Sequence, residues 1–266
     1  MPTFGEAVNS TPNYLKSLEA EGLLSIGSGC IISPNAIFDP SDLKGDKRPI
    51  SLSDRCRIMP GAILYGGVHL GEDVIVEEYS IVGKPELGYA VGKVYDGTGA
   101  ESRVGPSVIV RSGTVVYASV TIGAETTIGH KTLLRTGVTI GKHTQVAHGI
   151  TVERETTIGD YVRCSPLCHI TSRVVLEDRV FLGAGVVTIN DKGMIWKNER
   201  LQPDLVPPYF EHGAKVGSGS VIAAGVRIGR EALVGSGSVV THDIPAYALA
   251  YGVPARVKGD VKSLKA

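Results

Sequence analysis

A six-residue period runs through most of this chain and restricts the folds that are open to it. Stepping by six from Val110 to Thr188 gives Ile, Leu or Val at twelve of fourteen positions. Glycine often comes next, and the residue four places after each of these positions is also small or β-branched. This spacing matches neither a helical period nor simple alternation along a strand. We therefore predict an all-β solenoid of hexapeptide repeats.

Each hexad is expected to supply a short strand and a bend, with one aliphatic side chain pointing inward. The glycine would relieve crowding at the bend. A single hexad cannot bury its apolar side alone, so successive turns have to stack. Each turn then adds about 4.8 Å along the axis, which is the spacing of paired strands.

The repeat predicts a single domain over residues 1–266, with a β-helix over 24–244 between an N-terminal cap (1–23) and a C-terminal tail (245–266). Three excursions interrupt the period, at 39–50, 84–107 and 189–215. Loops this long are usually functional. Thr11 and Pro12, followed by Leu15 and Leu18, predict a short helix that covers one open end.

Charge and composition exclude several classes of partner. The 27 basic and 27 acidic residues balance, so no overall field attracts nucleic acid or an anionic membrane. We find no signal peptide and no apolar run of transmembrane length, and expect a soluble, cytoplasmic protein. The four cysteines form no Cys-x-x-Cys pair, which favours reduced thiols used as small hydrophobic residues.

The hexads, the interrupting loops and the closing segment YGVPARVKG (251–259) resemble the left-handed parallel β-helix acyltransferases of the hexapeptide-repeat family. The resemblance covers residues 24–259. It implies three hexads per coil, a homotrimer, and acetyl-coenzyme A as co-substrate. The loop 84–107 is similar to the inserted loop of nucleotide-linked 3-amino-3,6-dideoxyhexose N-acetyltransferases. This similarity implies a nucleotide sugar as the second substrate.

Two histidines are the candidates for a catalytic base. If three hexads make a coil, residues 18 apart stack, and His130 and His148 share the third position of their hexads. We predict that they lie one above the other, with His143 and His169 elsewhere. Histidine accepts protons near neutral pH, and two stacked imidazoles disfavour double protonation. A surface polar ladder is the alternative.

His148 is our first choice, because VAHGIT resembles the His-containing hexad that carries the base in several acyltransferases of this fold. Gly149 replaces the acidic residue that usually follows. The segment TINDK resembles the TNDK-type sequences of nucleotide-sugar N-acetyltransferases, in which this turn lies near the thioester. The resemblance implies that Asn190 orients a carbonyl or amine and that Asp191 contacts substrate. A simple loop-starting turn is the alternative.

Acidic and aromatic residues are the candidates for the sugar-nucleotide site. Glu153 and Glu155 could meet a substrate ammonium, although exposed strand charges are the alternative. Glu86 and Tyr89 lie in the loop 84–107, where a tyrosine ring could stack on a base or cover a sugar. A loop contact between subunits is the other interpretation of these two residues.

The arm and phosphates of coenzyme A need small residues and local cations. Its pantetheine arm could approach the backbone at five small residues: Ala184, Gly185, Ala223, Ala224 and Gly225. Its phosphates could bind five cations near the C-terminus: Lys215, Arg227, Arg230, Arg256 and Lys258. Each cation alone is also consistent with a solvated surface charge.

These features predict an enzyme that transfers an acetyl group from coenzyme A to an amine on a nucleotide-linked deoxyamino sugar, without a covalent intermediate and without a metal. O-acetylation of a different acceptor is one alternative. A metal hydrase similar to the γ-class carbonic anhydrases is another, since His143 and His148 match one of their spacings. The third ligand of such a site would fall near Ser107, which is not a metal ligand. A non-catalytic trimeric scaffold is the last.

Overall fold

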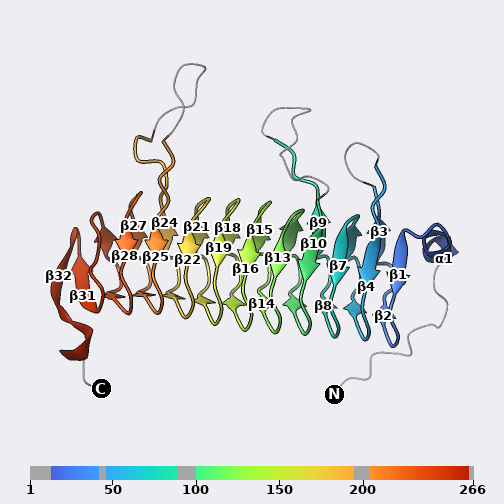
Figure 1. Cartoon of the computed structure of the whole chain (residues 1–266), viewed down its shortest axis with the longest axis horizontal. Helices are drawn as coiled ribbons and strands as arrows, with labels where there is room; N and C mark the ends of the chain where they lie inside the picture. Colours follow the sequence, from blue (N-terminus) through green and yellow to red (C-terminus); the bar gives the residue numbers. More distant parts are fainter. Residues whose placement is uncertain (1–12, 42–45, 89–99, 195–203, 264–266) are drawn as a thin grey trace. The chain divides into compact units, whose positions relative to one another are not determined.

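The computed structural model describes residues 13–41, 46–88, 100–194 and 204–263 (Figure 1). The chain divides into two compact units, Met1–Gly137 and Val138–Ala266, each of which is considered by itself. Each unit is a left-handed parallel β-helix of hexads. The period predicts the solenoid, and the handedness agrees with what the resemblance implies. Short strands follow one another along the chain, and every third strand returns to the same sheet. We label the sheets A, B and C by the order of their strands within a coil.

The first unit begins with helix α1 (Asn13–Ala20) and continues with strands of two to four residues. Sheet A contains β1 (Leu24–Ile26), β4 (Ile50–Leu52), β7 (Val68–Leu70), β10 (Ser102–Val104) and β13 (Thr121–Ile122). Sheet B contains β2 (Ile31–Ile32), β5 (Arg57–Ile58), β8 (Ile75–Val76), β11 (Ile109–Val110) and β14 (Thr127–Ile128). Sheet C contains β3 (Ile37–Asp39), β6 (Ile63–Tyr65), β9 (Ile81–Lys84), β12 (Val115–Tyr117) and β15 (Leu133–Leu134).

The second unit repeats this order and ends in a hairpin and a short 3₁₀ helix, η1 (Val261–Ser263). Sheet A contains β16 (Thr139–Ile140), β19 (Thr157–Ile158), β22 (Val175–Leu176), β25 (Tyr209–Phe210) and β28 (Arg227–Ile228). Sheet B contains β17 (Gln145–Val146), β20 (Arg163–Cys164), β23 (Phe181–Leu182), β26 (Lys215–Val216), β29 (Leu233–Val234), β31 (Ala248–Gly252) and β32 (Ala255–Asp260). Sheet C contains β18 (Thr151–Val152), β21 (His169–Ile170), β24 (Val187–Thr188), β27 (Val221–Ile222) and β30 (Val239–Val240).

The register confirms that three hexads make one coil. Arg103 pairs with Thr121 in the first unit, and Thr157 pairs with Val175 in the second, which are steps of 18 residues. We number each hexad from its core aliphatic residue, so that Ile128 is position one and Leu133 is position six. From β4 onward positions one and five are buried, whereas Ile26, Cys30 and Ile32 in the first coil are half-buried, and position six faces outward. This arrangement of buried and outward positions is what produces the six-residue period in the sequence.

Glycine serves two different positions in the hexad. At position two, Gly159 has an ordinary φ, but a Cβ there would lie 2.7 Å from Asp178 N and 2.9 Å from Glu177 C in the next coil. At position four the backbone is left-handed, with φ +70° at Gly219 and φ 54° at Lys131. Crowding against the next coil therefore explains the position-two glycines such as Gly159, as predicted, whereas the bend itself falls two residues later.

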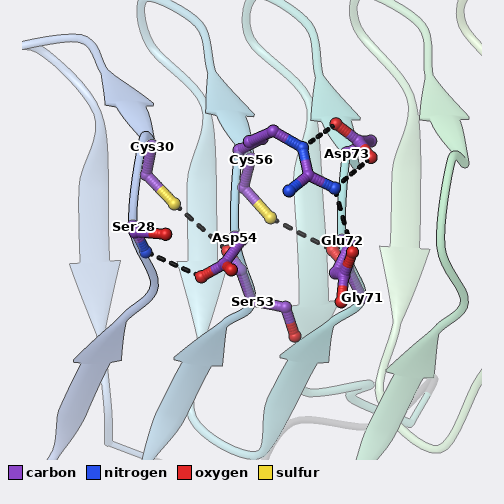
Figure 2. Close-up of polar contacts among 9 residues, drawn as sticks. Ser28, Cys30, Ser53, Asp54, Cys56, Gly71, Glu72 and Asp73 are labelled. Atoms are coloured by element: carbon purple, nitrogen blue, oxygen red, sulfur yellow. Dashed lines mark hydrogen bonds and ion pairs between the residues drawn. The ribbon is translucent and has the colours of Figure 1, made fainter.

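Where position five is Thr, Ser or Cys, its side chain can hydrogen-bond to a backbone carbonyl of the next coil. The Thr144 hydroxyl donates to Gly159 O over 2.8 Å, and the thiols of Cys30 and Cys56 donate to Ser53 O and Gly71 O over 3.1 Å (Figure 2). Burial raises the pKa of the Cys56 thiol to about 11, so it stays protonated as a donor. All four cysteines are free. Three of them are buried, which fits the predicted use as small core residues.

Both ends of the repeat carry other structure. At the start, Leu15 of α1 is fully buried and the Tyr14 hydroxyl donates to Ala36 O over 2.6 Å. At the end, β31 continues sheet B by pairing with β29, and β32 folds back antiparallel on β31. The expected tail therefore includes two strands. None of the helices in the described part of the chain is long and apolar enough to cross a membrane.

Two of the expected excursions are shorter than their predicted bounds. Strand β10 lies within 84–107, and its Val104 is buried. Strand β25 lies within 189–215, and its Phe210 is fully buried as a core residue. The repeat therefore resumes one hexad earlier in each case. Flanking prolines, Pro106 on one side of β10 and Pro208 before β25, hide these strands in the sequence.

We predict that Gly159→Ala destabilises the protein more than Gly219→Ala. The first change forces a methyl group into the backbone of the next coil and should lower the free energy of unfolding by about 3 kcal/mol. The second keeps open space around the new Cβ and costs only the left-handed backbone, about 1 kcal/mol. Denaturant unfolding followed by circular dichroism measures both. Equal losses would contradict the role given to position two.

Candidate functional site

The first unit presents an exposed histidine beside a carboxylate that is mostly buried. His130 follows β14 at position three, and its side chain is 56% exposed. Its Nδ1 lies 3.9 Å from Oε2 of Glu77, whose side chain is 17% exposed. Glu77 follows β8, at position two. Nδ1 thus faces a carboxylate, and Nε2 is the nitrogen left to accept a proton from a substrate.

Three donors fix the Glu77 carboxylate. Arg111 makes an ion pair with Oε1, and Ser112 donates to Oε2 from its backbone N over 3.0 Å and from its hydroxyl over 3.1 Å. Burial alone would raise the pKa of Glu77, but the hydrogen bonds from Arg111 and Ser112 outweigh burial and lower it. The carboxylate therefore stays ionised beside His130. Glu77 is a site residue that the hexad pattern does not point to.

His148 occupies the equivalent position of the second unit. It follows β17 at position three and is exposed, and no carboxylate of the described residues forms an ion pair with its ring. Because His130 and His148 belong to different units, the predicted stacking of the two rings stays a prediction. Both residues nevertheless lie at the corner that follows a strand of sheet B, as the shared hexad position requires.

The other two histidines of this region lie elsewhere, as expected. His143 is a position-four residue after β16, and its ring stacks on Tyr161 with 4.8 Å between ring centroids. His169 lies on the outer face of sheet C, where it pairs in register with Thr151. Within the described residues, no three His, Cys, Asp or Glu side chains gather as a metal site would require.

A second corner of the second unit, after the strands of sheet C, carries the polar candidates. Asn190 follows β24, and its Nδ2 donates to Ser172 Oγ over 2.8 Å. Glu153 follows β18 at position two, and Glu155 pairs with Arg173 over 2.7 Å. Asp191 accepts a 3.0 Å bond from Gly193 N at the start of the loop. Within one unit, sheet C separates this corner from His148.

Glu86 is buried, and its contacts are with other residues of the fold. Its side chain is 2% exposed and forms an ion pair with Arg135. Its Oε2 accepts bonds from Thr136 N over 3.0 Å and from the Thr136 hydroxyl over 2.6 Å. The carboxylate thus fastens the start of the loop to the β-helix. Tyr89 lies outside the described residues.

The predicted small residues fall on two corners of the second unit. Ala184 and Gly185 follow β23 of sheet B, whereas Ala223, Ala224 and Gly225 follow β27 of sheet C. The sheet B corner also has an uninterrupted column of small residues at position two, which the sequence analysis missed. Its members are Ala147, Ser165, Gly183, Gly217 and Gly235. A ligand arm could lie against backbone along this column.

The predicted cations lie toward the C-terminal end of the second unit. Lys215 pairs with Glu231 over 3.0 Å and lines a groove of about 230 Å³ with Phe181, Gly217 and Ser236. Two more lie on aromatic rings. Arg227 is 4.4 Å from the Tyr209 ring and pairs with Glu211, and Lys258 is 5.9 Å from the Tyr251 ring. Arg230 and Arg256 are exposed.

Comparison with known proteins confirms the repeat and the predicted resemblance. Residues 211–242 match a family model described as the hexapeptide repeat of succinyl-transferase. A stretch of 49 residues is 67% identical to dTDP-3-amino-3,6-dideoxy-alpha-D-galactopyranose 3-N-acetyltransferase from Aneurinibacillus thermoaerophilus, covering 18% of this chain and 26% of that protein. A longer match, 30% identical, covers 86% of this chain and 42% of the bifunctional protein GlmU from Fervidobacterium nodosum. The chain thus spans less than half the length of either relative.

Solved structures similar to this chain include an acetyltransferase and an acyltransferase. An acetyltransferase from Vibrio cholerae, solved with acetyl coenzyme A, is 19% identical with a TM-score of 0.38, and the match covers 52% of this chain and 69% of that one. The UDP-N-acetylglucosamine acyltransferase of Francisella novicida is 12% identical with a TM-score of 0.43, covering 90% and 71%. TM-scores this low do not support a comparison of sites.

The Glu77 network predicts a pH-dependent loss of stability. Because the folded-state pKa of Glu77 is lowered, its stabilising effect is complete above the ordinary carboxyl pKa of about 4.3 and is lost as the pH falls through the folded-state value. Glu77→Gln should lower the free energy of unfolding by about 1–3 kcal/mol at pH 7, and by less as the pH falls below the ordinary carboxyl value toward 3.

Denaturant unfolding at both pH values tests this, with Glu72→Gln as the control. Glu72 belongs to an exposed ion pair with Arg55 and should change stability little at either pH. A Glu77→Gln effect that is the same at both pH values would show that the carboxylate charge does not stabilise the fold.

Proposed function

We propose that this chain is an acyltransferase of the hexapeptide-repeat type, which transfers an acetyl group from acetyl-coenzyme A to the amine of a nucleotide-linked deoxyamino sugar. The carboxylate-supported imidazole of His130, exposed at a corner of the repeat, is the observation that carries the proposal. The 67% local identity to a sugar N-acetyltransferase supports the acceptor class. The repeat and its relatives support acyl transfer as the reaction type.

The reaction needs three things from the protein. It has to hold the amine against the thioester, remove a proton from the amine, and stabilise the negative charge that forms on the carbonyl oxygen. His130 accepts the proton at Nε2, while Glu77 orients the ring and balances the positive charge that results. The amine attacks the thioester directly, so the thiol of coenzyme A leaves without a covalent enzyme intermediate.

His148 is the alternative proton acceptor, since it holds the same hexad position in the second unit. Asn190, held by Ser172, could orient the amine or the carbonyl from the sheet C corner. The corners that carry His148 and Asn190 are different edges of one unit. A neighbouring subunit is then needed to bring both kinds of residue to one substrate, which agrees with the homotrimer that the resemblance implies.

Coenzyme A is expected to lie along the sheet B corner of the second unit. The column from Ala147 to Gly235 offers no side chain larger than serine, so the pantetheine arm can approach the backbone. Lys215 lines the adjoining groove and supplies a charge for a phosphate. Arg227 and Lys258 are the further cations near this end.

The test is release of free thiol from acetyl-coenzyme A in the presence of a panel of nucleotide-linked amino sugars. We predict thiol release with at least one amine acceptor, and a fall in kcat of about 10²- to 10⁴-fold in His130→Ala. His148→Ala shows whether the second histidine takes the role instead. The matched control is His242→Ala. His242 is also exposed and lies two residues after a position-one residue, as His130 does, and this variant should keep full activity.

Two outcomes would overturn the proposal. Thiol release only with alcohol acceptors would assign O-acetylation in place of N-acetylation. Absence of thiol release with every acceptor, from folded protein of uniform oligomeric state, would remove the acyltransferase assignment and favour a scaffold.

A further inference from the structure

A groove on sheet A of the first unit is separate from the corner that carries His130. Its volume is about 460 Å³, within the usual range of small-molecule sites. Four outward side chains form one row across its floor, in register on β4, β7, β10 and β13: Ser51, His69, Arg103 and Thr121. The glycines at position two, Gly71 and Gly105, place no side chain on the adjoining corner. A small ligand could therefore reach the row.

Three residues at this groove form a chain of polar contacts. The Ser51 Oγ and the His69 Nδ1 are 2.6 Å apart, at hydrogen-bonding distance. On the other side of the ring, His69 Nε2 lies 3.7 Å from Oε1 of Glu101. With the ring proton on Nε2, facing the carboxylate, Nδ1 accepts and the Ser51 hydroxyl donates. This is the order of groups that activates a serine hydroxyl.

We propose that Ser51, His69 and Glu101 form a second reactive centre, in which Ser51 is a nucleophile toward small acyl esters. The relative roles match those of a Ser-His-acid triad, with the two ring nitrogens exchanged. The Nε2 contact of 3.7 Å is longer than a hydrogen bond, and it shortens when the ring becomes charged, because catalytic contacts tighten in the reacting complex. His69 is 28% exposed, so a ligand in the groove can reach the pair.

The reaction balances with water as the only other reactant. Ser51 Oγ attacks the ester carbonyl carbon while its proton moves to His69 Nδ1. The bond to the alcohol oxygen breaks, and the leaving alkoxide takes that proton. Water then attacks the acyl-serine, loses a proton to Nδ1 and releases the acid, and the proton returns to Ser51 Oγ.

Arg103 offers the charge that the tetrahedral intermediate needs. It is the next residue of the row after His69, lines the same groove, and pairs with Glu101 through one of its nitrogens. The remaining guanidinium donors can face a developing oxyanion. Arg103 thus links the carboxylate of the centre to the position where negative charge would form.

The experiment uses the full-length protein and two probes. A fluorophosphonate should label Ser51, as located by peptide mass spectrometry, and p-nitrophenyl acetate should be hydrolysed with an initial burst. Ser51→Ala should abolish labelling, and His69→Gln should slow both reactions about 100-fold or more. Glu101→Gln should slow them less, because the carboxylate acts through the ring.

Ser25→Ala is the matched control, since Ser25 holds the same outward place on the neighbouring strand β1 and pairs in register with Ser51. It should keep full labelling and hydrolysis. An unlabelled Ser51, or labelling that persists in Ser51→Ala, would overturn the proposal. The readout is independent of acetyl-coenzyme A, so thiol release in Ser51→Ala separates failure of this centre from failure of the proposed transferase.

Discussion

The backbone hydrogen bonds between successive coils are the interaction on which the rest of this structure depends. Each strand has only two to six residues, and none pairs with its neighbour in sequence before β32. A strand that short gains stability only from the coils above and below it. The side chains at position five add a second set of bonds, such as Thr144 to Gly159 O, that fix the spacing of the coils from inside. A glycine such as Gly159 is therefore needed where the backbones of two coils approach most closely.

The same constraint decides where chemistry can occur. Positions one and five are committed to the core, so reactive groups appear on outer faces or at corners, and they gather as columns of equivalent positions. Asn190 beside Ser172 and Ser51 beside His69 are pairs from neighbouring coils, and His130 beside Glu77 joins coils two apart. A pair of this kind is held by two strands of the ladder, which makes its geometry more rigid than that of a pair on one loop.

The sequence alone predicts most of the fold, because the period is set by local needs that repeat. It predicts the solenoid, the short helix near Leu15 and the role of the cysteines, whereas the coil of three hexads is what the resemblance implies. It misses β25, whose Phe210 is a core residue but follows two prolines. It also misses Glu77, because Glu77 and His130 hold different hexad positions and the loop inserted between β9 and β10 interrupts the count of residues between their coils.

For the candidate site, the sequence predicts the hexad position of a residue better than the side chains that it contacts. It correctly separates His130 and His148 from His143 and His169, since this depends on hexad position alone. It does not reveal that Glu86 is buried against Arg135, because the loop has no period from which its contacts can be counted. Ser51 and His69 are 18 residues apart and both hold position six, which a reader of the sequence could notice. Many residue types occur at this outward position, however, so the spacing alone does not single out this pair.

The hairpin of β31 and β32 has a consequence for association between molecules. A β-helix that stopped at β29 would present a row of unpaired backbone groups, which could seed end-to-end growth into fibres. Because β32 runs antiparallel to β31, it offers an incoming parallel strand the wrong polarity at the end of sheet B. Reversal of a single strand thus blocks continued growth of this sheet.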